Sequence, residues 1–286
     1  MNRRNSNSCL EPIPVMINLT HPHDPLLQKK KEWFIQQPGI NWLYAETNKP
    51  LIREGGVLPI LNLTRKGAYF ECGKNRVTFH PSMALLRLIQ ILRGERDRFL
   101  QAVQLHEGDT FIDATLGLGT DALVASYQVG KSGKVLGIEH SPILAALVKE
   151  GLLNLAQGYY PRVNNPEKAK AWELLAEAAG RIEVLWGDHL QVLSKYPSEA
   201  VDVVYFDPMF RHTRTQSASI RPLHEFANPQ PLSHEAIGEA VRVARRKVVL
   251  KERKGSPQFN RLGFIIQEGG NYSPVDYGAI TKGDGL

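Results

Sequence analysis

The chain has 286 residues, 42% of them hydrophobic, which suffices for one large α/β domain with an appendage or for two modest domains. No apolar run approaches the roughly 18 residues of a membrane helix, and the polar start lacks the apolar core of a signal peptide, so we expect a cytoplasmic protein with no membrane association. Cys9 and Cys72 are far apart and without histidines at ligand spacing, and His21-Pro-His23 lacks a third distant ligand, so no metal site is predicted. The 35 basic and 29 acidic residues give a formal charge of +6, a modest bias toward a polyanionic partner.

The amino-terminal third mixes strand and helix patterns. Residues 1–14 are polar and punctuated by proline, which predicts a flexible tail. Residues 15–95 are expected to form a small α/β or α+β unit with a helix near Leu26–Gln36 and strands at Val15–Leu19, Val57–Leu63 and Ala68–Cys72. An amphipathic helix then begins at Ser82, a candidate N-cap, and runs to about Arg93. Its predicted buried stripe consists of Met83, Leu85, Leu86, Ile89 and Leu92.

Residues 96–286 alternate strand and helix patterns, which predicts a parallel sheet with helices on both faces. The predicted parallel strands are Thr110–Asp113, Lys134–Glu139, Ile182–Asp188, Val201–Asp207 and Val248–Lys251. An antiparallel pair, Gly263–Gln267 with Asp276–Ile280, is expected to close the sheet. Residues 154–166 are expected to form a loop before a helix over 167–179.

The segment Asp113-Ala-Thr-Leu-Gly-Leu-Gly-Thr-Asp121 is typical of a nucleoside-cofactor loop. Gly117 and Gly119 allow a tight turn and a close approach of the backbone to a ligand, and a helix can begin near Asp121. Glu139 ends the next strand about 20 residues later, where a carboxylate can accept both ribose hydroxyls. These features also fit a dinucleotide site, so they leave the cofactor open.

Two further strands end in acids. Asp188 either binds an adenine amine or caps the next helix, and the residues leave both interpretations open. Asp207-Pro208-Met-Phe210 follows the fourth strand and is similar to the (Asp/Asn)-Pro-Pro-aromatic signature of methyltransferases that modify exocyclic amines. An aromatic amine is a poor nucleophile, so it must be held in line while its protons are accepted; Asp207 and the Pro208 carbonyl can accept them, and Phe210 can stack on the base.

Together these motifs resemble the ribosomal small-subunit methyltransferase J family of S-adenosylmethionine-dependent rRNA guanine-N2 methyltransferases, in an uncharacterised Gram-positive branch. The resemblance covers roughly residues 99–280 and implies a Rossmann-like class I methyltransferase sheet. It implies S-adenosyl-L-methionine as cofactor, with the loop residues Asp113, Thr115, Gly117 and Gly119 around it. The family pattern places further cofactor contacts at Thr120, Asp121, Glu139, His140, Asp188, His189 and Asp207.

Basic residues follow the Asp-Pro-Met-Phe motif directly. Arg211, Arg214 and Arg221 would surround the mouth of the site, where the backbone of RNA, as small-subunit rRNA or as a ribosomal subunit, has to pass. The runs Lys29–Lys31 and 242–247 either add to this basic surface or are solvated faces. A protein side chain as methyl acceptor and a non-catalytic RNA-binding module are the alternatives, and a dehydrogenase is the weakest, because Asp-Pro-Met-Phe has no role in hydride transfer. The sequence does not specify the oligomeric state.

Overall fold

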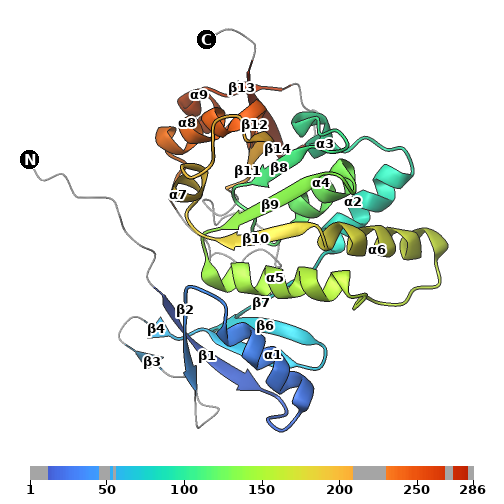
Figure 1. Ribbon diagram of the computed structural model, residues 1–286, viewed down its shortest axis with the longest axis vertical. Coiled ribbons are helices and arrows are strands. Elements are labelled where there is room, and N and C mark those ends of the chain that lie inside the picture. Colours follow the sequence, from blue (N-terminus) through green and yellow to red (C-terminus); the bar gives the residue numbers. More distant parts are fainter. Residues whose placement is uncertain (1–11, 45–51, 54–55, 209–229, 268–272, 283–286) are drawn as a thin grey trace, which may run out of the picture.

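Figure 1 shows the computed structural model, which describes residues 12–44, 52–53, 56–208, 230–267 and 273–282. Two sheets lie one above the other, and helix α5 (Pro142–Ala156) runs between them. The upper sheet and its helices form the larger part of the molecule, and the amino-terminal sheet lies beneath it. The fold is therefore two sheet layers that share one helix.

The amino-terminal sheet has the strand order β2-β1-β5-β6-β7. Its strands are β1 (Ile13–Leu19), β2 (Ile40–Tyr44), β5 (Ile60–Thr64), β6 (Gly67–Cys72) and β7 (Asn75–Thr78), and a separate two-stranded ribbon pairs β3 (Ile52–Arg53) with β4 (Gly56–Val57). The pairs β1–β2 and β1–β5 are parallel, and β5–β6 and β6–β7 are antiparallel. Helix α1 (Pro25–Ile35) is the crossover that allows β1 and β2 to pair in parallel. The three strands predicted here are present; β2 and β7 were not predicted.

The large sheet has the strand order β10-β9-β8-β11-β12-β14-β13. Its strands are β8 (Thr110–Asp113), β9 (Lys134–Glu139), β10 (Ile182–Trp186), β11 (Val201–Phe206), β12 (Ala244–Arg253), β13 (Ile265–Ile266) and β14 (Val275–Thr281). Pairings from β10 to β12 are parallel, and β14 runs antiparallel to both of its neighbours. The chain reverses its direction of winding between β8 and β11, and ligands of such sheets bind outside the carboxyl ends of the strands at that point.

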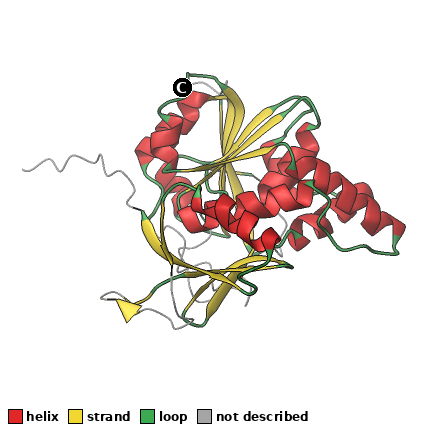
Figure 2. Cartoon of the chain, turned by 60° about the horizontal axis from the view of Figure 1, so that its bottom comes forward, coloured by secondary structure: helices red, strands yellow, loops and turns green. Residues whose placement is uncertain are grey.

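Helices cover both faces of this sheet, as Figure 2 shows. One face packs against α2 (Ser82–Leu92), α3 (Arg98–Val103), α4 (Thr120–Val129), α5 and α6 (Pro166–Ala179), and the other against α7 (His189–Leu193), α8 (His234–Val243) and α9 (Gln258–Leu262). The central strands are buried on both sides, which is why Val203-Val-Tyr-Phe206 reads as a continuous apolar run. The predicted α/β, Rossmann-like class is confirmed.

Helix α2 lies where it was predicted, but its details differ. Pro81 is the N-cap residue and the helix start has no side-chain cap, so the prediction of Ser82 as N-cap was wrong. Met83 and Leu86 are 57% and 55% exposed, whereas Ala84 and Leu88 are fully buried. The helix packs against α4 and α6 through the stripe centred on Leu85 and Leu88, because its rotation is set by these two partners. The predicted loop also begins later, since α5 continues to Ala156.

The two sheets meet through α5. Its apolar residues Ile143 and Leu147 belong to the core of the amino-terminal sheet, while Val148 and Leu152 belong to the core of the large one. Gly151 lets Phe79 approach closely, because a Cβ at position 151 would lie 2.1 Å from the Phe79 ring. Lys30 of α1 forms an ion pair with Glu150 at 2.9 Å. The segment around Phe79, which joins β7 to α2, and helix α5 therefore fix one sheet relative to the other.

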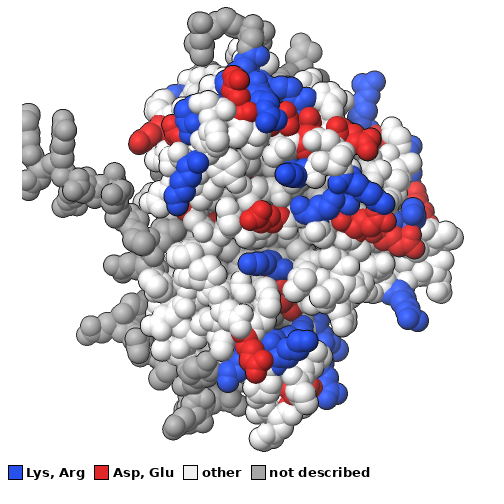
Figure 3. Space-filling view, in the orientation of Figure 1, with Lys and Arg blue, Asp and Glu red and all other residues white. Residues whose placement is uncertain are grey.

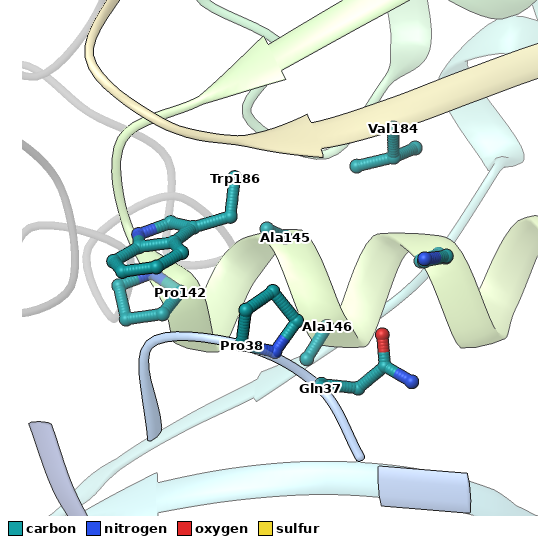
Figure 4. A pocket seen from close by; sticks show the side chains of 8 residues that line it. Gln37, Pro38, Pro142, Ala145, Ala146, Val184 and Trp186 are labelled. Atoms are coloured by element: carbon teal, nitrogen blue, oxygen red, sulfur yellow. The ribbon is translucent and has the colours of Figure 1, made fainter. Parts of the chain in front are cut away.

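A small hollow lies beside this junction (Figure 4). It is lined by Gln37, Pro38, Pro142, Ala145, Ala146, Lys149, Val184 and Trp186. Gly39 is close by, where a Cβ would lie 2.6 Å from the Trp186 ring. None of the acids at the ends of the strands lines this hollow. Among the described residues, no helix is long and apolar enough to cross a membrane.

Candidate active site at the carboxyl edge of the large sheet

The loop between β8 and α4 adopts the conformation that its glycines allow. Gly117 and Gly119 have φ angles of 53° and 73°, in the left-handed region that glycine adopts without strain. Gly119 is the N-cap of α4, and within the part of the chain that the structure describes no side chain caps the first amides of this helix. The Asp113 carboxylate accepts a hydrogen bond from the Thr115 backbone amide at 3.1 Å. The start of α4 therefore presents backbone amides that no described side chain caps, at the switch point of the sheet.

Glu139 ties this loop to the neighbouring strand. Its carboxylate accepts hydrogen bonds from the backbone amides of Gly117 at 2.9 Å and Ser141 at 2.8 Å. The side chain is buried, and burial raises the pKa of Glu139 to about 7 although both amides oppose the shift. Each carboxylate oxygen has a second lone pair, so the same group can also accept from a ligand.

A helix cap and two histidines lie at the ends of β9 and β10: His140 follows β9, and Asp188 and His189 follow β10. Asp188 is the N-cap of α7 and accepts a hydrogen bond from the Gln191 amide at 3.1 Å, so the helix-capping role left open by the sequence is present. Its other oxygen lies 3.9 Å from Nδ1 of His140, a buried nitrogen that has no hydrogen-bond partner among the described residues. Burial lowers the pKa values of His140 and His189. Both rings are therefore held in the neutral form near the predicted cofactor edge.

Asp207 follows β11 directly opposite the glycine loop. Its backbone amide donates a 2.6 Å hydrogen bond to Oγ1 of Thr115, which joins the end of β11 to the loop after β8. Its carboxylate accepts a 2.7 Å hydrogen bond from Nζ of Lys251, at the end of β12. Pro208 comes next and is partly exposed. The motif is therefore placed at the switch point and is held there by one bond to its backbone and one to its side chain.

A buried cluster of charges surrounds Asp207. Lys251 also donates to Asp121 at 3.2 Å, and Asp121 in turn accepts from Arg87 at 2.5 Å and from the Tyr205 hydroxyl at 2.8 Å. Burial opposes ionisation of Asp121, but the charges of Lys251 and Arg87 outweigh it and lower its pKa to about 2. Burial, together with the charge of Asp121, raises the pKa of Asp113 well above its usual range. The cluster thus holds Asp121 ionised and disfavours ionisation of Asp113.

The structure brings the predicted site residues of the described chain to one edge of the sheet. Phe210, Arg211, Arg214 and Arg221 lie outside the described residues. Sequence reasoning missed Lys251, Tyr205 and Arg87 as members of this cluster. The sequence does contain a signal for Lys251: it follows the apolar run Val248–Leu250 at the carboxyl edge of the sheet, where ligands of this fold bind.

Comparison with known proteins places the chain in a family. A family model described as "Putative SAM-dependent methyltransferase" matches residues 71–263. The chain belongs to this family. An uncharacterized protein of Bacillus subtilis, YpiP, is 41% identical over 205 residues, 72% of each chain. A SAM-dependent methyltransferase structure from Neisseria gonorrhoeae covers 96% of this chain and 97% of its own with a TM-score of 0.59 at 16% identity, which shows the shared fold.

The ribosomal RNA small subunit methyltransferases J are further relatives of this methyltransferase. The one from Alteromonas mediterranea is 29% identical over 163 residues, 55% of this chain and 56% of that protein. The one from Aeromonas salmonicida is 32% identical over 163 residues, 55% of this chain and 59% of that protein. The matched segments thus span little more than half of these relatives. They confirm the resemblance drawn from the motifs.

S-adenosylmethionine is the cofactor of this family, and the described edge fits it. The fit rests on the side-chain-free positions Gly117 and Gly119, the uncapped first amides of α4 and the Glu139 carboxylate at the end of β9. When bound, this cofactor supplies an electrophilic methyl group. The cofactor contacts stay predictions for every residue named from the sequence, which are Asp113, Thr115, Gly117, Gly119, Thr120, Asp121, Glu139, His140, Asp188, His189 and Asp207. The carboxylate of Asp121 is already bonded to three side chains of the protein.

We expect Glu139→Ala to weaken S-adenosylmethionine binding by about 1–3 kcal/mol, because charge-assisted bonds to the ribose and the brace on Gly117 are both lost. Isothermal titration calorimetry measures this change. The matched control is Glu183→Ala, which removes an exposed carboxylate from the neighbouring strand β10. Equal affinities of the two variants would remove Glu139 from the cofactor site.

Proposed function

We propose that this methyltransferase transfers a methyl group to an exocyclic amine of RNA, and specifically to guanine N2 of small-subunit rRNA. The observation that carries the proposal is the position of Asp207-Pro208, which follows β11 at the switch point of the sheet and beside the glycine loop. The names of the rRNA-modifying relatives support the choice of RNA as substrate. The Asp-Pro-Met-Phe sequence supports an amine as acceptor.

Each residue of the motif has a chemical task in this proposal. The Asp207 carboxylate accepts an N–H bond of the target amine, which turns the nitrogen lone pair out of the ring system and toward the methyl group. The Pro208 carbonyl accepts the second N–H bond, and Phe210 stacks on the base. The carboxylate also stabilises the positive charge that develops on the nitrogen. No strong base is needed, because the nitrogen becomes acidic as the new bond forms.

The arginines after the motif are proposed to hold the RNA backbone. Figure 3 shows acidic side chains beside basic ones near the top, the right and the bottom of the face in view. In the run 242–247, Arg242 pairs with Glu239 at 2.7 Å, Arg245 pairs with Asp202 at 3.2 Å, and Arg246 pairs with Asp109. This run is therefore largely neutralised within the protein. Arg211, Arg214 and Arg221 are the better candidates because of their place in the chain.

We expect replacement of Arg211, Arg214 and Arg221 by alanine to weaken RNA binding and to reduce its salt dependence. Loss of three phosphate contacts should lower the slope of log affinity against log salt by about 2–3. Filter binding over a range of salt concentrations measures the slope, and calorimetry should show unchanged cofactor affinity. Replacement of Arg242, Arg245 and Arg246, which are paired with acids, is the matched control and should keep the parental slope.

The decisive test of the function is to map methylated nucleotides in rRNA from cells with and without this protein. We expect one N2-methylguanine of small-subunit rRNA to disappear and to return when the gene is restored. Unchanged rRNA, with methyl transfer to a protein instead, would contradict the proposal. If the variant without Arg211, Arg214 and Arg221 bound RNA with the parental slope of log affinity against log salt, that result would also contradict the proposal.

A further inference from the structure

Lys251 occupies the centre of the buried charge cluster at the carboxyl edge. Its Nζ lies 2.7 Å from Oδ2 of Asp207 and 3.2 Å from Oδ2 of Asp121. Only 18% of its side chain is exposed, and it follows three buried apolar residues of β12. A lysine placed between two buried carboxylates carries its charge at pH 7, and the charges of Asp121 and Asp207 raise its pKa despite burial.

Asp121 anchors this lysine to the rest of the protein. Its Oδ1 accepts from Arg87 at 2.5 Å, and its Oδ2 accepts from the Tyr205 hydroxyl at 2.8 Å. Arg87 binds Asp97 with two further bonds, at 2.7 and 2.9 Å. The ammonium of Lys251 is therefore held by a network that reaches from α2 through α4 to β12. Its position relative to Asp207 is set by contacts that do not involve a substrate.

We propose that Lys251 is a positioning residue for methyl transfer, which keeps Asp207 ionised and engages its Oδ2 so that Oδ1 remains to accept the target amine. This inference rests on the proposed role of Asp207 as the acceptor. Within the described residues, Oδ1 of Asp207 makes no hydrogen bond, whereas Oδ2 is bonded to Lys251. The carboxylate thus has one oxygen committed to the protein.

The protonation of Asp207 depends on this lysine. Burial raises the pKa of Asp207 to about 6, and the charge of Lys251 keeps it from rising further. The other charged or titratable groups that act on the Asp207–Lys251 pair or adjoin it are Asp113 of β8, Asp121 of α4, Arg87 of α2, Tyr205 of β11, Glu252 of β12 and Tyr277 of β14. Without the charge of Lys251, a larger fraction of the carboxyl would be protonated at pH 7, and a protonated carboxyl would present a donor to the amine.

The proposal predicts a change that a purely structural ion pair would not cause. Methyl transfer requires ionised Asp207, so activity is lost as pH falls through its pKa. Removal of the lysine charge from a contact this short should raise the pKa of Asp207 by about 1–3 units. The pH at which kcat falls on the acid side of its pH profile should rise by the same amount. At pH 7 this lowers kcat by about twofold to a hundredfold, because the protonated fraction of Asp207 rises. The KM values for RNA and cofactor should change little.

The experiment compares Lys251→Met with Lys251→Arg over pH 5–9. Lys251→Met removes the charge and keeps the apolar stem, while Lys251→Arg keeps the charge and should restore the parental acid limb in large part. Lys247→Met is the matched control, since Lys247 is a buried lysine of the same strand whose Nζ contacts Gln104 at 2.6 Å. If Lys251→Met does not fold, Lys251→Gln, which also lacks the charge, is measured in the same way.

A second measurement separates this inference from the proposed function. A ¹³C NMR titration of labelled aspartate carboxyl groups, assigned by the signal lost in Asp207→Asn, gives the pKa of Asp207 without any substrate. An unchanged pKa in the charge-removing variant overturns the role of Lys251. A raised pKa with a parental pH profile of methyl transfer overturns Asp207 as the acceptor instead. A raised pKa and a shifted acid limb together support both.

Discussion

Asp207→Asn should lower the rate of methyl transfer by roughly 10²-fold or more while the fold is preserved. Lys251 donates to one side of this group, so the carbonyl of the new amide turns toward the ammonium and its N–H points at the target amine. The amine then meets a donor in place of an acceptor, and the charge that stabilises the developing positive nitrogen is gone. Loss of one preorganised electrostatic contact has effects of this size.

A single-turnover assay on the identified RNA measures this effect apart from product release. Asp202→Asn is the matched control, because Asp202 lies near the opposite end of β11 and bonds the Thr110 amide and Arg245. This control should react at the parental rate. A near-parental rate for Asp207→Asn would mean that the Asp-Pro-Met-Phe motif does not carry the reaction.

Arg87→Ala should destabilise the protein by about 3 kcal/mol or more. Its guanidinium makes a bidentate pair with Asp97 and a third bond to Asp121, and its side chain is only 17% exposed. Removal leaves buried carboxylates without their partner, which costs far more than the pair contributes to stability when intact. Asp121 keeps Lys251 and Tyr205, so the larger part of the loss is expected at Asp97.

Urea unfolding followed by circular dichroism measures the change in the free energy of unfolding. Arg93→Ala is the control, because Arg93 is the C-cap residue of the same helix and forms a solvent-exposed ion pair with Glu167. An exposed pair of this kind contributes little to stability, so its midpoint should match the parent. Equal midpoints for Arg87→Ala and the parent would show that the Arg87 contacts are not needed for the fold.

The amino-acid sequence by itself determined the strands of the large sheet and the positions of their terminal acids. Strands buried on both faces must be apolar throughout, so β8 and β9 were predicted with their observed bounds. The glycines of the loop were recognisable because residues with positive φ are mostly glycine. By contrast, β2 and β7 are edge strands, and the mixed polar and apolar pattern of β7 gives a weak signal.

Only the tertiary structure decided which of the acids form ion pairs or hydrogen bonds with other side chains, and with which ones. Arg87, Asp121, Tyr205 and Lys251 are distant in the chain and come from four elements, yet they form one network. Local patterns do not show that Arg87 is partly buried, because the rotation of α2 is set by its packing against α4 and α6. The charge state of Asp207 likewise depends on burial and on Lys251, 44 residues away. Electrostatic interactions act through space, so the sequence places these side chains at an edge, and only the fold sets the distances between them.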